Sequence, residues 1–295
     1  MLTVCAPAKV NLVLEVLARQ GDYHRISSIV QSIDLCDVLQ FRLGEQACFT
    51  CDEAGLEQDN LVIRAAALLK ESTGCTLGAR IELRKRIPWG FGLGGGSSDA
   101  AAALVALNKL WGLGLSPSEL VPLAARLGSD VPFFITGGTA LVGGKGEEVT
   151  SLPALPETWF VLLVPPLPKI PGKTGQMYAR LDSSLFTDGR YVQQALSCLR
   201  HGRTIEPHLM FNAFERVADD LLPELAKYRE ALREAGADKA YLAGSGPGLF
   251  ALFRDRAAAH MVFSRVRAQG LESYLAGCVA RNSGHGPSLP EGSKF

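Results

Sequence analysis

Alternating hydrophobic and polar residues dominate the first 60 positions of this chain of 295 residues. The alternation falls into short blocks separated by Gly, Asp and Arg, namely KVNLVLEVL, SSIVQSIDL, DVLQFRL and QACFTC. Because successive side chains of a strand point to opposite faces, this period of two predicts half-buried strands in a mostly antiparallel arrangement. The block ARIELRKRI alternates in the same way and predicts a strand just before a glycine-rich stretch.

Hydrophobic residues at helical spacing follow these strands. They predict three helices in the first half, at about residues 61–73, 98–111 and 116–127. Asp59 or Asn60 would cap the first of these helices and Gly74 would stop it. Residues 131–152 predict further strand and turn. In the second half, helices are predicted within residues 175–182, 191–202, 211–236 and 257–270, and strands within 159–164, 239–244 and 248–253.

The mixture of strand and helix patterns, without a visible internal repeat, predicts an α+β protein. Its length favours two domains, since a domain takes roughly 100 to 200 residues. We place the boundary ahead of the apolar strand within a proline-rich stretch, which gives domains of residues 1–155 and 156–280. Residues 281–295 are polar and rich in Gly, Pro and Ser, so we expect a disordered tail there.

Basic and acidic side chains balance at 30 each, and hydrophobic residues make up 47% of the chain. Nucleic acids and anionic membranes are held mainly by clustered Lys and Arg, so a net charge near zero argues against both as partners. No segment reaches the roughly 20 apolar residues that cross a bilayer. The seven cysteines are an odd number scattered along the chain, which indicates reduced thiols. We therefore expect a cytoplasmic protein with small-molecule ligands.

The stretch IPWGFGLGGGSSDA has five glycines in seven positions, followed by two serines and an alanine-rich helix. Glycines let the backbone approach a ligand closely, and a helix start offers unpaired N–H groups with the positive end of the helix dipole. We interpret residues 88–98 as a phosphate-binding segment and call it the phosphate loop. Ser97 and Ser98 could cap the helix, contact phosphate or ligate Mg²⁺.

Two more familiar nucleotide motifs fail on their context. Gly90, Gly92 and Gly95 match the spacing of a dinucleotide-binding fingerprint. The strand before them is basic, however, whereas a buried parallel strand is usually apolar. The fingerprint also needs an acidic residue at the end of a second strand to bind the ribose, but Glu119, near that position, lies at the start of a predicted helix. The segment PGKTG, residues 171–175, has Leu167 where a P-loop requires glycine, and three prolines remove backbone donors.

Several residues outside the phosphate loop could carry chemistry. Lys9 and Asn11 share one face of an early strand, although an isolated strand lysine is commonly only a solvated one. Asp130 follows a helix that ends at Gly128 and precedes an apolar strand, where its carboxylate would need a partner or would cap a turn. The ring of Tyr23 could stack on a base or lie in a surface turn. Residues 244–248 form a second glycine turn, between two strands.

These segments resemble the GHMP small-molecule kinases. The resemblance covers about residues 5–255 and rests on PAKVNL, YH followed by SI and D, DNLVIRAA, GLGGGSSDAAAAL, LNKLW, LGSDVPFF, GGTALVGGKGE and GSGPGLF, all in the order of the family. It implies a two-domain GHMP kinase fold, with a ribosomal-protein-like, left-handed β-α-β N-terminal domain and a ferredoxin-like C-terminal domain. It also implies ATP-dependent phosphorylation of the 2-hydroxyl of a cytidylyl methylerythritol substrate.

The resemblance implies roles for residues at matching positions. Lys9 and Asp130 match the catalytic pair. The substrate-binding positions are Asn11, Tyr23, His24 and Thr174. The ATP-binding positions are Asn60, Lys85, Pro88, Gly90, Gly92, Leu93, Gly94, Gly95, Gly96, Ser97 and Ser98. Mg²⁺ is implied as the metal ion, but the sequence identifies neither its ligands nor an oligomeric state.

The chain departs from the family pattern at three places. Phe91 stands where Ala or Gly is common and would narrow the phosphate loop. Gly21-Asp22 reverses the usual order of the two residues before Tyr23, which would change how Tyr23 and His24 are presented to the substrate. Lys173 stands where Ser is common. Two alternatives remain: a GHMP kinase for another alcohol, such as homoserine or mevalonate, and a catalytically inactive nucleotide-binding regulator. The presence of both catalytic residues argues against the second.

Overall fold

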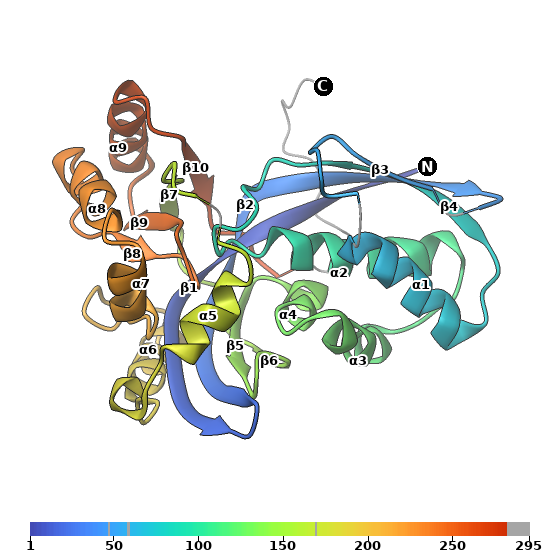
Figure 1. The fold of residues 1–295 in the computed structure, drawn as a ribbon, viewed down its shortest axis with the longest axis horizontal. Helices are drawn as coiled ribbons and strands as arrows, with labels where there is room; N and C mark the ends of the chain where they lie inside the picture. Colours follow the sequence, from blue (N-terminus) through green and yellow to red (C-terminus); the bar gives the residue numbers. More distant parts are fainter. Residues whose placement is uncertain (47, 58–59, 169, 282–295) are drawn as a thin grey trace.

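Two sheets with their covering helices make up the protein (Figure 1). The computed structural model describes residues 1–46, 48–57, 60–168 and 170–281. Within these residues, one sheet has six strands and the other four. Apart from Arg281, the tail predicted at 281–295 lies outside the described residues, as does Asp59.

The six-stranded sheet is built on one long hairpin. Its two strands, β1 and β2, join through a two-residue turn at Gly21 and Asp22, where Gly21 has φ 59°. The sheet order is β3-β4-β2-β5-β6, and β1 pairs antiparallel with β2. The strands are β1 (Leu2–Gln20), β2 (Tyr23–Gly44), β3 (Cys48–Cys51), β4 (Gly78–Arg84), β5 (Thr139–Gly143) and β6 (Glu148–Ser151). The alternating blocks therefore form strands as predicted, with two of the blocks fused in β2.

Four helices cover one face of this sheet: α1 (Leu61–Thr73), α2 (Gly95–Leu110), α3 (Pro117–Leu127) and α4 (Val131–Thr136). The side chain of Asn60 caps α1 by accepting from the Val62 amide at 2.9 Å, and Gly74 ends the helix at φ 71°. The prediction for α2 is wrong by three residues, because Gly94 at φ 75° is its N-cap and the following glycines already belong to the helix.

The strand predicted directly after Asp130 is wrong, because Val131–Thr136 is the short helix α4. Pro132 lies in its first turn, where the missing N–H of proline costs no hydrogen bond. Five of its six residues are buried, so its apolar run is explained by burial on all sides and not by a strand.

The four-stranded sheet is antiparallel, in the order β10-β7-β9-β8. Its strands are β7 (Trp159–Leu163), β8 (Tyr241–Leu242), β9 (Leu249–Phe253) and β10 (Ser273–Gly277). Its helices are α5 (Lys173–Ala179), α6 (Arg190–Arg200), α7 (Glu215–Leu221), α8 (Leu225–Glu234) and α9 (Arg256–Ala268). The helical pattern predicted across residues 211–236 forms two helices, since Pro223 interrupts the backbone bonding between them.

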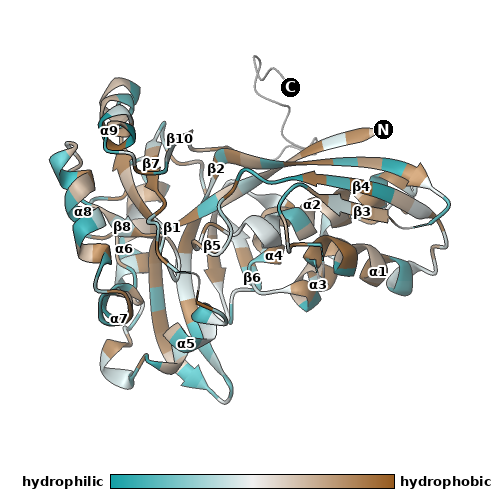
Figure 2. Ribbon diagram, turned by 45° about the horizontal axis from the view of Figure 1, so that its top comes forward, coloured by the Kyte–Doolittle hydropathy of each residue, from teal (hydrophilic) through white to brown (hydrophobic). Residues whose placement is uncertain are grey.

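The first strand connects the two halves. In Figure 1, β1 runs from the six-stranded sheet towards the second half, where α6 packs against it. The Leu14 amide donates to the Phe211 carbonyl at 2.7 Å, and the Ala213 amide donates to the Leu14 carbonyl at 2.9 Å. Figure 2 shows hydrophobic residues along the middle of the long strands and a hydrophilic tip of the β1–β2 hairpin. Residues of β1 are therefore available to a site that both halves share.

Candidate active site

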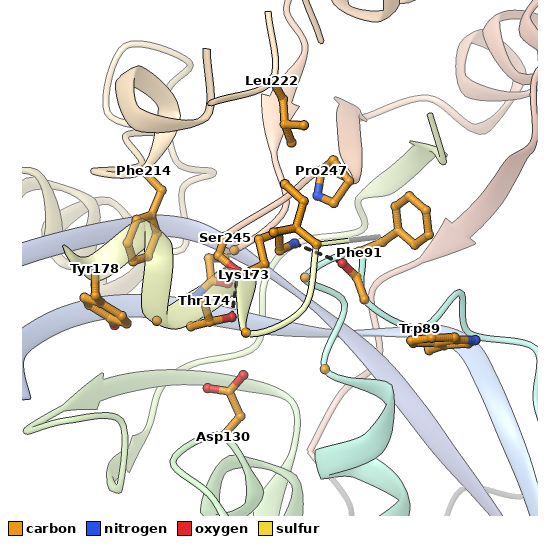
Figure 3. A pocket seen from close by; sticks show the side chains of 18 of the residues that line it. Trp89, Phe91, Asp130, Lys173, Thr174, Tyr178, Phe214, Leu222, Ser245 and Pro247 are labelled. Carbon is orange, nitrogen blue, oxygen red and sulfur yellow. Dashed lines mark hydrogen bonds between the residues drawn. The ribbon is translucent and has the colours of Figure 1, made fainter. Parts of the chain in front are cut away.

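A cavity of about 440 Å³ lies between the two halves. Its walls come from β1, the phosphate loop, the residue before α4, the start of α5 and the turn between β8 and β9 (Figure 3). Tyr178 and Phe214 lie at one end with ring centroids 4.9 Å apart, and Trp89 lies at the other. A volume of this size accommodates a small organic ligand.

The phosphate loop forms one wall of this cavity. Gly90, Gly92 and Gly94 have φ angles of 87°, 82° and 75°, a region that glycine occupies without strain. No side chain caps α2 at Gly94, so the first amides of this helix of 16 residues are left to a ligand. The loop is fixed to β1 because the Lys9 amide donates to the Leu93 carbonyl at 2.9 Å.

The remaining predicted loop residues differ in their exposure. Pro88, the first residue of the loop, is half-buried, Gly95 is buried, and Gly96 is exposed in the first turn of α2. Ser97 is half-exposed, whereas Ser98 is 1% exposed and its Oγ has no hydrogen-bond partner among the described residues. A buried, unpaired hydroxyl at a helix start is an available ligand for an anion or for a metal ion that accompanies it.

The two glycine turns meet at the base of the cavity. A Cβ atom placed on Gly92 would lie 1.9 Å from the carbonyl oxygen of Ala243, and one placed on Gly248 would lie 2.5 Å from the carbonyl oxygen of Phe91. The two backbones are therefore in direct contact, which glycine alone permits. Phe91 itself is buried here, so its side chain is part of the contact between the halves.

Lys9 and Asp130 lie together in the cavity. The Lys9 ammonium is buried, donates to Asn11 Oδ1 at 2.6 Å and lies 3.7 Å from Asp130 Oδ2. The Asp130 side chain is 49% exposed and makes no capping bond to α4, so its carboxylate faces the cavity. Asn11 is fixed in turn by donating to Ser28 Oγ at 2.9 Å. The structure thus brings together the predicted catalytic pair and one predicted substrate residue.

Lys85 lies on the other side of the phosphate loop, away from this cavity. Its ammonium donates to Asp37 and, at 2.8 Å, to Asp99 Oδ2, and all three side chains are buried. Asp37 also accepts the amides of Arg86 and Ile87 at 2.6 and 2.8 Å, which shapes the approach to the loop. Burial and the neighbouring Asp37 raise the pKa of Asp99, and the two carboxylates raise the pKa of Lys85.

A second cavity, of about 460 Å³, adjoins the first and shares Gly175 and Tyr178 with it. Tyr23 and His24 line this second cavity, so they are separated from Asn11, with which we grouped them. The His24 ring stacks on Tyr178 with centroids 5.0 Å apart, and burial and Arg19 lower the pKa of His24. Tyr23 is 45% exposed, next to the hairpin turn, which leaves its ring accessible.

Thr174 lies between the two halves at the start of α5. Its hydroxyl is 3.1 Å from Ser245 Oγ, in the turn after β8. Asn212 supports that turn by donating to the carbonyls of Leu242 and Gly244 at 3.0 and 2.8 Å. The remaining predicted ATP residue, Asn60, acts as the cap of α1, as described above.

Sequence reasoning missed three residues that organise this region: Asp37, Asp99 and Asn212. Asp99 directly follows the two serines of the phosphate loop, so its position was a usable signal. The other two have no local signal, because their partners are distant in the chain. Among the described residues, no group of three His, Cys, Asp or Glu side chains could hold a metal ion, and no helix is long and apolar enough to span a membrane.

Comparison with known proteins agrees with this geometry. The model of the GHMP kinases N terminal domain matches residues 60–138, and that of the GHMP kinases C terminal domain matches residues 194–271. This chain belongs to the GHMP kinases. The predicted α+β, two-domain GHMP kinase fold is confirmed, and the chain is an ATP-dependent small-molecule kinase.

Similar proteins share most of their length with this GHMP kinase. A 4-diphosphocytidyl-2-C-methyl-D-erythritol kinase of Dehalococcoides mccartyi (strain BAV1) is 46% identical over 93% of this chain and 97% of its own. One of Pelotomaculum thermopropionicum is 41% identical over 90% and 94%. A crystal structure of 4-(cytidine 5'-diphospho)-2C-methyl-D-erythritol kinase has a TM-score of 0.80 at 34% identity, over 94% and 99% of the two chains. A homoserine kinase of Cytophaga hutchinsonii, with a TM-score of 0.72 at 20% identity, covers 96% of each chain and shares the fold.

Proposed function

We propose that this kinase transfers the γ-phosphoryl group of ATP to the 2-hydroxyl of 4-diphosphocytidyl-2-C-methyl-D-erythritol, a step of non-mevalonate isoprenoid precursor synthesis. The names of relatives that are 41–46% identical over at least 90% of this chain support the substrate. The observation that carries the chemistry is the Asp130 carboxylate, half-exposed in the cavity and 3.7 Å from the Lys9 ammonium. Tyr23 and His24, in the adjoining cavity, are suited to a nucleobase.

The phosphate loop fits the polyphosphate of ATP. Its positive-φ glycines leave no side chain between the backbone amides and a ligand, and a Cβ on Gly94 would lie 3.0 Å from Lys9 Cγ. Ser98 Oγ, buried without a partner among the described residues, is an oxygen suited to Mg²⁺. Mg²⁺, when bound with ATP, neutralises charge on the β- and γ-phosphates.

In the proposed step, Asp130 accepts the proton of the 2-hydroxyl while the hydroxyl oxygen bonds to the γ-phosphorus. The bond between that phosphorus and the leaving oxygen of ADP breaks. Phosphoryl transfer has a loose transition state, so a carboxylate is a sufficient base when the proton leaves late. Lys9, held by Asn11, lies beside the Asp130 carboxylate and offsets the negative charge of the transferred group.

The test is ADP release, coupled to a spectroscopic readout, with the cytidylyl substrate, homoserine and mevalonate in turn. We expect turnover with the cytidylyl substrate, and we expect Asp130→Ala to lower kcat by about 10²- to 10⁴-fold, the usual contribution of a general base. Asp220→Ala, which removes an exposed carboxylate from α7, is the matched control and should behave as wild type.

Each other outcome overturns a defined part of the proposal. Unchanged turnover in a folded Asp130→Ala variant would remove the base assignment. Turnover with homoserine or mevalonate alone would replace the substrate. Calorimetric binding of ATP without turnover of any of these alcohols would favour a catalytically inactive regulator.

A further inference from the structure

The start of α5 buries a second lysine in the cavity. Lys173 is 9% exposed, and its ammonium donates to the carbonyl oxygen of Gly90 at 2.9 Å, a bond drawn in Figure 3. An ammonium carries three donors. Across the described ranges of the chain, Lys173 has no carboxylate within 4.0 Å and no second hydrogen-bond acceptor. Its charge is therefore offset by one neutral carbonyl only.

The charge of the cavity favours an anion beside Lys173. Among the residues that the structure describes, its charged lining consists of Lys9, Lys173 and Asp130, so two ammonium groups against one carboxylate give these three a net charge of +1 when all are ionised. Burial, and then the charge of Lys9, lower the pKa of Lys173 to about 8. The remaining titratable side chain among the described lining residues is Tyr178 on α5, whose pKa burial and Asp130 raise to about 12.

Another buried lysine of the same molecule is compensated differently. Lys85 is also buried beside the phosphate loop, and two carboxylates compensate it. A buried ammonium that lacks such compensation costs free energy in the free protein. An anionic ligand offsets that cost when it accepts the remaining hydrogen bonds of the ammonium. The ligand is expected to be a phosphate, because Lys173 contacts the phosphate loop.

We propose that Lys173 is a second cationic contact for phosphate in this site, binding a phosphate oxygen of the reactants together with Lys9. The inference rests on the proposed function, which supplies two sources of that oxygen: the triphosphate of ATP and the diphosphate of the cytidylyl substrate. Lys173 belongs to the segment PGKTG, which cannot form a P-loop. In this fold its lysine reaches the phosphate loop from the opposite half of the molecule.

The experiment combines kinetics and calorimetry on wild type, Lys173→Met and Lys173→Arg. Lys109→Met, which removes an exposed lysine at the end of α2, is the control. We expect Lys173→Met to lower kcat/KM by about 100-fold, as for loss of one preorganised donor to a developing charge, and Lys173→Arg to recover part of it. The parameter that changes identifies the source: the KM for ATP if Lys173 contacts the triphosphate, and the KM for the cytidylyl compound if it contacts the diphosphate.

Proton uptake separates ligand contact from a structural role. A pKa of about 8 leaves part of the Lys173 population neutral at pH 8 to 9, so a phosphate contact should be accompanied by proton uptake when wild type binds the ligand. Titrations with the Mg²⁺ complex of a non-hydrolysable ATP analogue, and separately with the cytidylyl compound, in buffers of different ionisation enthalpy measure this uptake. Lys173→Met should abolish it, and Lys109→Met should retain it.

Two results would overturn the inference. One is wild-type kinetics for Lys173→Met from pH 7 to 9.5, and the other is the absence of proton uptake by wild type with both ligands. The second measurement needs no variant, so it decides even if Lys173→Met does not fold. If wild type fails to turn over the cytidylyl compound, the proposed function fails, but the titration with the ATP analogue still tests Lys173.

Discussion

Three buried lysines flank the phosphate loop, and their surroundings differ. On the inner side, Lys85 lies between Asp37 and Asp99, and all three side chains are shielded from water. On the cavity side, Lys9 has Asn11 and one carboxylate at 3.7 Å, and Lys173 has a single carbonyl. The inner charges are compensated within the protein, whereas the cavity charges are compensated only in part.

The compensated charges on the inner side hold the phosphate loop in place, whereas the charges on the cavity side remain available to a ligand. Asp37 binds Lys85 and two backbone amides at once, so the inner side fixes the loop whether or not a ligand is present. An enzyme stabilises a transition state best with charges that are already in position and not neutralised by their own neighbours. The following variants test this separation, from the largest expected effect to the smallest.

Asp37→Asn should cause the largest loss, on the inner side. It removes a charge from a buried ion pair, which costs about 3–5 kcal/mol of unfolding free energy. Urea denaturation at pH 7 measures the loss. Asp99→Asn is the comparison, with an expected loss of about 1 kcal/mol, because one Asp99 oxygen already lacks a partner among the described residues and Asp37 still pairs with Lys85. Equal losses would show that both carboxylates are required to hold the loop.

Lys9→Met should impair catalysis without unfolding the protein. Loss of the ammonium leaves Asp130 without its neighbouring cation and the transferred phosphoryl group with one cation fewer, so kcat should fall by about 10²- to 10³-fold. The melting temperature should remain within a few degrees of wild type. A variant that loses stability in proportion to its activity would show that Lys9 holds the fold together in the way that Lys85 does.

Lys173→Met should stabilise the free protein at neutral pH. Wild-type Lys173 has a pKa of about 8 when folded and about 10.5 when unfolded, so below pH 8 the folded state bears the full cost of a buried charge. The variant should melt a few degrees higher at pH 7, a gain on the order of 1–3 kcal/mol. Between about pH 8 and 10.5 the unfolded state binds more protons, wild type gains stability, and the difference should close. A lower melting temperature for the variant at pH 7 would contradict this account.

Thr174→Val should have the smallest effect. It removes one exposed hydroxyl that is 3.1 Å from Ser245, and a single neutral hydrogen bond contributes about 1 kcal/mol. The KM for the alcohol substrate should rise about fivefold, with the KM for ATP unchanged. Ser245→Ala tests whether Thr174 acts through its neighbour: an equal rise supports that route, and wild-type behaviour indicates direct contact with the substrate.

Much of the fold follows from local pattern. The strands β1 and β2 were predictable because hydrophobic and polar residues alternate over many positions, even though the middle of β1 is buried on both faces. Local pattern fails where burial surrounds a segment: the run VPFFIT is apolar on all sides, so periodicity does not separate its helix from a strand. The strand β10, with the sequence SYLAG, lacks a clean alternation and is defined by its pairing with β7.

In the site, too, some features were predictable from the local sequence and others depend on distant contacts. The position of the phosphate loop was predictable, because glycines at a helix start have a direct physical consequence. The partners of Lys85 were not, because Asp37 is brought to it by the pairing of β2 with β4, where Val38 lies opposite Arg84. The contact between the two glycine turns was not predictable from the sequence either, because it depends on how the two sheets pack.

The contact between Gly92 and Ala243 bears on how the enzyme matures during synthesis. A ribosome releases β1 and the phosphate loop first, and Ala243 emerges only after about 150 further residues have been made. The base of the cavity therefore closes last, after loop closure across about 150 residues, which is slow compared with helix formation. Nucleotide capture by a nascent chain would accordingly report complete folding, and fragments that end before β8 should not acquire it.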